Sequence, residues 1–174
     1  MHRERSRAVV YLESGECKIV SRNQRNLGFT TLKKALAKLP AQNAILDGEI
    51  ICVDARGVSR FNELLGRKGD PVLYVFDLLW LDGNDLRQLP LVERKERLSR
   101  LVQAANCPRL IYAQHIEEHG TQFFAEICTL DLEGIVAKRK RGIYKDDGGS
   151  WLKIKNRTYS QAEGRHELLT CQRS

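Results

Sequence analysis

One long apolar run, residues 72–81, constrains the fold more than any other stretch of this sequence. Its side chains are aliphatic or aromatic except for Asp77, and such a run is typical of a β-strand buried on both faces. A lone carboxylate there must be paired, hydrogen-bonded or neutralised, because removing an unpaired charge from water is costly. The sequence therefore predicts a buried central strand and a polar partner for Asp77.

Shorter elements around this strand predict an α+β fold. Residues 44–53 are interrupted by Asp47-Gly48-Glu49, which fits either a tight hairpin turn or one strand with a bulge at Gly48. We also expect a hairpin of residues 8–12 and 17–20, turns at 54–57 and 82–84, and a strand at 110–113. Helices are expected over 31–39, ending at Pro40, and from Pro90 to 102, with Glu93, Arg94, Lys95 and Glu96 on one charged face, and a helical turn is expected at 61–65. A further helix is expected to be capped by Thr121, with Phe124, Ile127, Cys128 and Leu130 facing inward. Short strands without regular βαβ alternation predict two mainly antiparallel sheets with flanking helices.

Two lysines near the end of the chain are candidate ligand-binding residues. Lys153 and Lys155 are two positions apart, so in a strand they share one face with Trp151, while Leu152 and Ile154 lie on the other. Glu133 opens a second β-rich run that we expect to lie beside them. Two cations near a carboxylate suit a polyphosphate and its metal ion, although a solvated sheet face is the alternative interpretation.

Composition and charge narrow the classes of protein. The net charge of +7 and the pI near 9.3 indicate an affinity for polyanions. The five cysteines form no C-x-x-C pair, which favours free thiols in a reducing cytoplasm over a disulfide framework or zinc site. No apolar run approaches the length of a membrane span and no signal peptide is recognisable, so we expect no membrane partner.

Four motifs in order resemble the ATP-dependent DNA ligases, most closely the bacterial end-joining type. Ile45-Leu-Asp-Gly-Glu-Ile50 is similar to motif III, and Tyr74-Val-Phe-Asp-Leu-Leu-Trp-Leu-Asp-Gly83 to motif IIIa. Leu132-Glu-Gly-Ile-Val-Ala-Lys138 resembles motif IV, and Trp151-Leu-Lys-Ile-Lys155 resembles motif V. The resemblance extends from Arg7 to Leu169 and implies the fold of the ligase nucleotidyltransferase core.

The resemblance also implies a reaction. In this family a lysine of a K-x-D-G-x-R motif attacks the α-phosphate of ATP, and the AMP then passes to the 5′-phosphate at a DNA nick, where the 3′-hydroxyl displaces it. The implied ligands are therefore ATP or AMP, Mg²⁺ and DNA, in a cytoplasmic, nucleoid-associated bacterial protein.

Each matched position carries an implied role. Phe76 would stack on adenine, Glu49 and Arg22 would hold the ribose and its surroundings, and Arg7 would also bind the nucleotide. Glu133, with Glu49, would bind Mg²⁺, and Lys153 and Lys155 would bind the nucleotide and neutralise charge building on the α-phosphate. The alternative interpretation from the residues alone is that Phe76 is only a core aromatic and that the polar residues are solvated strand or turn positions.

The pattern departs from the family at motif I. Aligning Arg7 with the last position of that motif places His2 where the nucleophilic lysine belongs. A further basic residue, expected before Lys153, falls on Asp147, with Lys145 or Arg141 as substitutes. We therefore expect a partial nucleotidyltransferase domain over residues 1–169 and a tail at 170–174, without an OB-fold domain, that does not adenylylate itself. Half of a split ligase, completed by a second chain that supplies motif I or an OB-fold, and a gene remnant are the alternatives.

Two other functions are compatible with parts of the sequence. His115-Ile-Glu-Glu-His119 fits the H-x-x-E-H pattern of inverted zinc peptidases, which requires both histidines on one helix. The basic run Lys138-Arg-Lys-Arg141, with Lys145 and the basic N-terminus, is typical of a non-catalytic nucleic-acid binder or of a solvated loop.

Overall fold

The computed structural model describes residues 7–52, 70–145 and 151–160 of the 174-residue chain. Within these residues the chain divides into two compact units. The first comprises residues 7–114 together with Lys140–Tyr144, and the second comprises His115–Arg139 together with residues 145–160. The turn expected at 54–57 and the helical turn expected at 61–65 lie outside the described residues.

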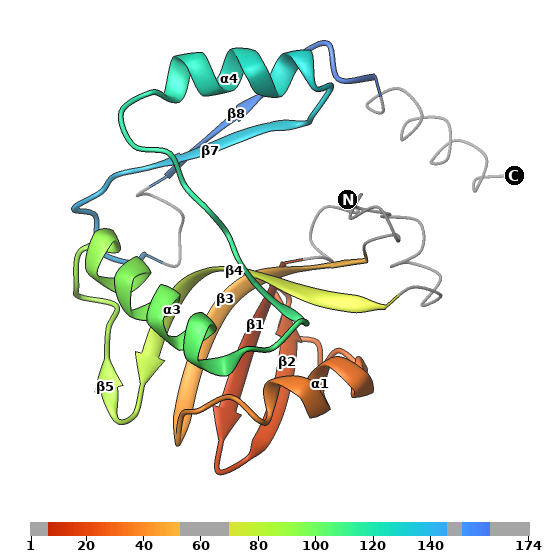
Figure 1. The fold of residues 1–174 in the computed structure, drawn as a ribbon, viewed down its shortest axis with the longest axis vertical. Coiled ribbons are helices and arrows are strands. Elements are labelled where there is room, and N and C mark those ends of the chain that lie inside the picture. Colours follow the sequence, from red (N-terminus) through yellow and green to blue (C-terminus); the bar gives the residue numbers. More distant parts are fainter. Residues whose placement is uncertain (1–6, 53–69, 146–150, 161–174) are drawn as a thin grey trace, which may run out of the picture. The chain divides into compact units, whose positions relative to one another are not determined.

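A sheet forms the framework of the first unit (Figure 1). Its described strands run in the order β2-β1-β3-β4-β5, and β6 also pairs with β4. All of the pairings are antiparallel except that of β6 with β4. The strands are β1 (Arg7–Glu13), β2 (Glu16–Ser21), β3 (Asn43–Cys52), β4 (Pro71–Leu81), β5 (Asn84–Asp85) and β6 (Leu110–Tyr112). The predicted apolar strand is thus confirmed as β4, which has neighbours on both sides.

Two-residue turns close both hairpins of this sheet. Ser14 and Gly15 connect β1 to β2 with φ angles of 50° and 82°, and Asp82 and Gly83 connect β4 to β5 with φ angles of 46° and 84°. Left-handed angles at both positions match the twist of the flanking strands. Both hairpins confirm the turns expected from the sequence.

The Asp47-Gly48-Glu49 interruption does not end β3. Asp47 pairs with Asp77 and Gly48 pairs with Val75, so Phe76 of β4 is an extra residue at a β-bulge. A Cβ atom on Gly48 would lie 2.9 Å from the carbonyl oxygen of Tyr74, which explains why glycine stands where the strands come close. Of the two alternatives, the single irregular strand is therefore confirmed.

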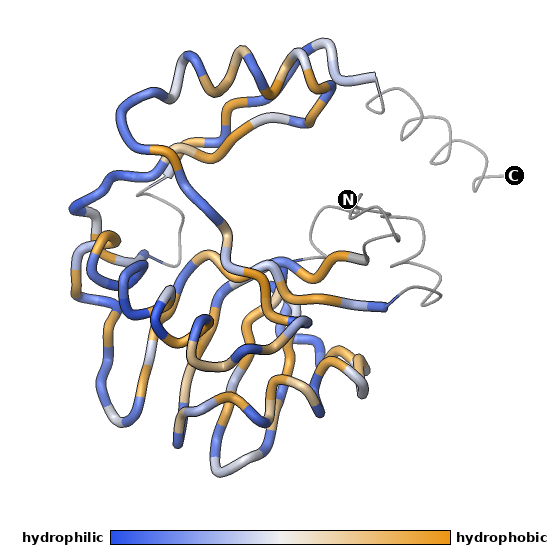
Figure 2. The backbone as a smooth tube through the Cα atoms, viewed as in Figure 1, coloured by the Kyte–Doolittle hydropathy of each residue, from blue (hydrophilic) through white to orange (hydrophobic). Residues whose placement is uncertain are grey.

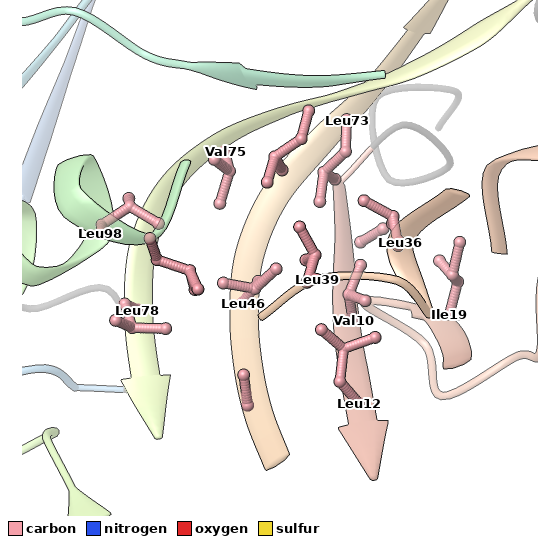
Figure 3. Packing of buried hydrophobic residues seen from close by; sticks show 14 of the residues in the cluster. Val10, Leu12, Ile19, Leu36, Leu39, Leu46, Leu73, Val75, Leu78 and Leu98 are labelled. Carbon is pink, nitrogen blue, oxygen red and sulfur yellow. The ribbon is translucent and has the colours of Figure 1, made fainter. Parts of the chain in front are cut away.

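Two helices pack on one face of the sheet and form the core. They are α1 (Thr30–Leu36) and α3 (Leu91–Ala105). Figure 3 shows Leu36 of α1 and Leu98 of α3 among the strand residues Val10, Leu46 and Val75, and all of these side chains are fully buried. Figure 2 shows β4 as mostly hydrophobic and α3 as mixed and largely hydrophilic, in agreement with a buried strand and a helix that packs only one face on the core.

Both helices differ in detail from the expectation. Helix α1 ends at Leu36 rather than Leu39, and tighter hydrogen-bonded turns continue it to Leu39. Helix α3 follows Pro90 as expected, but the exposed charged face that we predicted is wrong at two positions. Arg94 and Lys95 are only 2% and 7% exposed, because each finds a buried partner.

The second unit is a hairpin with one helix. It contains α4 (Gly120–Thr129), β7 (Gly134–Lys138) and β8 (Trp151–Lys155), and the two strands pair antiparallel. The predicted cap is wrong, because His119 precedes the helix and Thr121 lies inside it. Ile127 is buried as expected, whereas Leu130 follows the helix and is exposed. The two mainly antiparallel sheets with flanking helices confirm the predicted α+β class.

Candidate active site

The two candidate lysines lie on one face of the β7–β8 hairpin. Lys153 faces Val136 and Lys155 faces Gly134 across the ladder, and Trp151 continues the same row. Leu152 and Ile154 alternate with these residues and lie on the other face. The shared face of the two ammonium groups is therefore confirmed.

Glu133 and Lys153 form an ion pair. The Lys153 Nζ lies 3.1 Å from Glu133 Oε1, and the two side chains are 36% and 31% exposed. The Glu133 carbonyl accepts a 2.9 Å hydrogen bond from the backbone N–H of Asn156. Glu133 thus ends the turn immediately before β7, where it is held beside β8 by both its backbone and its side chain.

A glycine makes this arrangement possible. Gly134 has a φ angle of 140°, and a Cβ atom there would lie 2.1 Å from the carbonyl oxygen of Ile154. Only glycine fits this backbone and this approach of the two strands. The residue after Glu133 is consequently as important to the position of the carboxylate as any charged partner.

Arg7 and Phe76 form a cationic and aromatic pair in the first unit. The Arg7 guanidinium lies 5.7 Å from the centre of the Phe76 ring, within the range of a cation–π contact. Its Nε and Nη2 atoms donate hydrogen bonds of 3.2 Å and 2.7 Å to the two oxygens of Asp47. Burial disfavours the charged form of Arg7, but the hydrogen bonds and charge of Asp47 outweigh it and raise the pKa of Arg7.

Glu49 and Arg22 lie near the same end of the sheet. Glu49 of β3 faces Arg7 of β1 and Tyr74 of β4 in the ladder, and its side chain is exposed. Arg22 is exposed on the turn after β2 and directly follows Ser21, which pairs with Ala8. The four residues that the family resemblance assigns to the nucleoside therefore lie in the first unit, towards one end of its sheet.

Asp77 has the partner that its burial required. Arg94 of α3 donates from Nε and Nη2 to the two oxygens of Asp77 at 2.8 Å and 3.0 Å, and both side chains are at most 3% exposed. The backbone N–H of Leu78 adds a third hydrogen bond at 3.0 Å. A fork of two parallel hydrogen bonds is the strongest way to satisfy a buried carboxylate.

Sequence reasoning missed Asp47 and Tyr144 as residues of this region. The Tyr144 hydroxyl donates a 3.1 Å hydrogen bond to Asp47 Oδ2, and the Tyr144 ring lies 5.9 Å from the Arg94 guanidinium. Asp47 interrupts an apolar strand just as Asp77 does, so the same burial argument would have found it. No sequence signal marks Tyr144, because its partner is 97 positions away in the chain.

The predicted site residues thus fall into two sets, one in each unit. Arg7, Arg22, Glu49 and Phe76 belong to the first unit, and Glu133, Lys153 and Lys155 belong to the second. Their convergence around one nucleotide stays a prediction. His2 and Asp147 lie outside the described residues, while Arg141 and Lys145 are exposed.

The described residues contain no group of three or more His, Cys, Asp or Glu side chains arranged to hold a metal ion. The segment 115–119 is not helical, so the two histidines lack the helix that an inverted zinc peptidase requires. Magnesium needs less from the protein, since one or two carboxylates combine with substrate phosphates and water. The carboxylates of Glu49 and Glu133 fit that role chemically.

None of the described helices is long and apolar enough to cross a membrane.

Comparison with known proteins identifies the family. The sequence is 33% identical over 152 residues to the multifunctional non-homologous end joining protein LigD of Pseudomonas aeruginosa, which covers 83% of this chain but only 18% of that protein. The fold is similar to the ligase domain of M. tuberculosis LigD, with a TM-score of 0.74 and 31% identity over 86% of this chain and 50% of that one. It is also similar to mycobacterial DNA ligase D in complex with ATP and MES, with a TM-score of 0.72 and 29% identity over 86% of this chain and 51% of that one. The family profile of the ATP dependent DNA ligase domain matches residues 4–155, and this chain therefore belongs to that family.

Proposed function

We propose that this chain binds the adenylate group and acts in the joining of DNA strands. The observation that carries the proposal is the Arg7–Phe76 pair beside Glu49, a cation, an aromatic ring and a carboxylate at one end of the first sheet. The similar mycobacterial DNA ligase D was solved with ATP bound, which supports a nucleotide as the ligand.

The first unit is proposed to bind the nucleoside. Phe76 stacks on adenine, an interaction worth about 1–3 kcal/mol by analogy with other base–aromatic contacts. Glu49 and Arg22 hold the ribose, since a carboxylate accepts hydrogen bonds from sugar hydroxyls and a guanidinium donates to their oxygens. Arg7 stays charged beside Asp47 and so offers a fixed positive charge at the edge of the adenine site.

The second unit is proposed to act on the phosphate. In the sealing step the 3′-hydroxyl of one strand attacks the adenylylated 5′-phosphate of the other. A new P–O bond forms, the P–O bond to AMP breaks, and the hydroxyl proton is released. Lys153 and Lys155 stabilise the negative charge that develops on the transferring phosphate, because cations placed in advance need no reorganisation.

A magnesium ion is proposed as the cofactor. Glu133 of the second unit would hold it, and when bound it would polarise phosphate oxygens and orient them. Lys153 stays close to Glu133 through their ion pair, so the carboxylate is held in place before any ligand arrives.

DNA is the proposed partner. Lys138, Arg139, Lys140 and Arg141 are exposed, and cations on a surface bind the phosphate backbone with a strong dependence on salt.

The free thiols of Cys17, Cys107 and Cys128 agree with a reducing cytoplasm. A second chain that supplies the motif I lysine is also part of the proposal, because the motif resemblance places His2 at that position.

Nick sealing on DNA that is already adenylylated tests this proposal. The full chain with Mg²⁺ is expected to close such a nick, and Lys153→Gln is expected to slow closure by about a hundredfold. Lys18→Gln is the matched control, because Lys18 is an exposed strand lysine in β2. Closure that is absent in the full chain, or insensitive to Lys153, would contradict a catalytic role.

Intact-mass measurement after incubation with ATP and Mg²⁺ tests the nucleophile. We expect no AMP-sized increase, and a stable increase would overturn that expectation. A DNA-binding measurement tests the alternative function. Salt-dependent retention of DNA without adenylate binding or nick closure would favour a non-catalytic nucleic-acid binder built on the exposed basic run.

A further inference from the structure

Arg7 needs to be held if it is to present a fixed charge. An arginine side chain loses much rotational freedom when it is ordered, so its orientation depends on its partners. The Arg7 side chain is 29% exposed and makes two hydrogen bonds to Asp47, which is 1% exposed. The orientation of the guanidinium over Phe76 is therefore set by the orientation of the Asp47 carboxylate.

Tyr144 is a further donor to that carboxylate. Its hydroxyl lies 3.1 Å from Asp47 Oδ2, the same oxygen that accepts the 2.7 Å hydrogen bond from Arg7. A buried carboxylate that loses a donor turns towards its remaining partners or admits water. The hydroxyl of Tyr144 thus restricts the rotation of Asp47 and, through Asp47, of Arg7.

The segment that carries Tyr144 is itself held by backbone hydrogen bonds. The carbonyls of Lys140 and Gly142 accept from the N–H groups of Val92 and Leu91 at 3.1 Å and 3.0 Å. These donors belong to the first turn of α3, which has no side-chain cap and otherwise leaves its N–H groups without a partner inside the helix. The N–H of Tyr144 donates to the carbonyl of Arg87 at 2.8 Å.

The side chain of Arg94 joins this segment to the second buried ion pair. Arg94 donates to the Gly142 carbonyl at 3.3 Å and lies near the Tyr144 ring, while its other nitrogens bind Asp77. Tyr144 therefore lies between two ion pairs, Asp47–Arg7 and Asp77–Arg94. Tyr144 also interacts with Arg7 directly, through a side-chain hydrogen bond and its charge, and this contact helps to raise the pKa of Arg7.

We propose that Tyr144 is a positioning residue for the nucleotide surface formed by Arg7 and Phe76. It acts on Arg7 both through Asp47 and by direct contact, and the inference rests on the proposed binding of an adenine nucleotide by Arg7 and Phe76. Removal of the hydroxyl weakens nucleotide binding without removing any atom that touches the nucleotide.

Calorimetric titration with AMP tests the proposal. Tyr144→Phe is expected to weaken binding about fivefold, the size of one ordinary hydrogen bond, with little change in the melting temperature. Tyr11→Phe is the matched control and is expected to bind as the unaltered protein does, because Tyr11 is a partly exposed strand residue in β1. Equal affinity of Tyr144→Phe and the unaltered protein would overturn the proposal.

A double-mutant cycle separates positioning from general stability. If Tyr144 acts through Arg7, then Tyr144→Phe has no further effect on AMP affinity once Arg7→Met is present. Additive effects would contradict the proposal, because they would show that the hydroxyl acts by another route.

A readout without ligand keeps this inference separate from the proposed function. In an NMR spectrum of arginine side chains, the Arg7 Nε–H resonance of Tyr144→Phe is expected to shift and to exchange faster with water. An unchanged resonance overturns the positioning role. A changed resonance in a protein that binds no AMP supports the positioning of Arg7 and contradicts the proposed nucleotide function.

Discussion

The two units hold their charged residues in different ways. In the first unit, Asp77 and Arg94 are at most 3% exposed, and Asp47 is 1% exposed beneath Arg7. In the second unit, the side chains of Glu133 and Lys153 are both about one-third exposed. The first unit contains the whole buried hydrophobic cluster, whereas Ile127 is the buried hydrophobic residue of the second unit among the described positions.

This difference in burial determines how firmly each unit holds its charged residues before a ligand binds. Buried ion pairs in a packed unit are stiff, because any movement exposes an uncompensated charge in a region of low polarity. A partly exposed pair on a hairpin costs little to break, since water replaces the lost partner. We therefore expect the nucleoside residues to be preorganised and the lysine face to adjust to its phosphate.

The largest effect on stability is expected from breaking the Asp77–Arg94 pair. Arg94→Met leaves a buried carboxylate with a single hydrogen bond from the Leu78 N–H, so the free energy of unfolding should fall by about 3–5 kcal/mol. Denaturant unfolding measures this loss. The control is Arg87→Met, which breaks an exposed pair with Asp85 of similar geometry and should cost less than about 1 kcal/mol.

The double variant Asp77→Leu with Arg94→Met sharpens the same measurement. It should recover part of the lost stability, because it removes the orphaned charge as well as its partner. Equal losses at Arg94 and Arg87, which both belong to the first unit, would show that burial does not distinguish these pairs, and burial could then not explain a difference in stiffness between the two units.

A smaller and local loss is expected from Gly134→Ala. The added methyl group meets the Ile154 carbonyl and requires a strained φ angle, so the β7–β8 pairing should weaken by about 2 kcal/mol or more. Hydrogen exchange is expected to accelerate in β7 and β8 while β3 and β4 stay protected. Gly83→Ala provides the comparison, since its φ angle is also positive but open space surrounds it. Loss of protection in β3 would mean that the two units do not unfold separately.

Glu133→Gln should have a still smaller effect on stability and a large effect on function. The side chains of the Glu133–Lys153 ion pair are about one-third exposed, so the free energy of unfolding should change by less than about 1 kcal/mol. Sealing of a pre-adenylylated nick should nevertheless slow by about tenfold or more, because the proposed magnesium ligand loses its charge. A stability loss as large as that of Arg94→Met would remove the distinction between the two units.

The smallest effect concerns the thiol of Cys17 beside the core of the first unit. Burial raises the pKa of Cys17 to about 11, so the reactive thiolate is scarce at neutral pH. Its alkylation rate, followed by peptide mass spectrometry, should rise about tenfold per pH unit up to about pH 10. An ordinary thiol would level off above about pH 9. A plateau at that lower pH would show that this part of the first unit is more open than its burial indicates.

Much of the fold was predictable, because hydrophobic periodicity acts locally. The strand at 72–81, the first hairpin, the turn at 82–84 and the shared face of Lys153 and Lys155 follow from alternation and turn residues. The burial of Arg94 and Lys95 was not predictable, because a helix beginning at Pro90 gives no local sign of which charges it carries inward. The choice between a turn and an irregular strand at Asp47-Gly48 also depended on β4, a partner far along the chain.

The candidate site divides in the same way. Family motifs named Phe76, Glu49, Glu133 and the two lysines, since each lies in a short stretch whose spacing is its signature. They did not name Tyr144, and they left the partner of Asp77 unknown. The sequence by itself determined which side chains are available and on which face of each strand they lie, because that depends on neighbouring residues. Only the tertiary structure decided which buried charges meet, because pairing across long separations depends on how the whole chain packs.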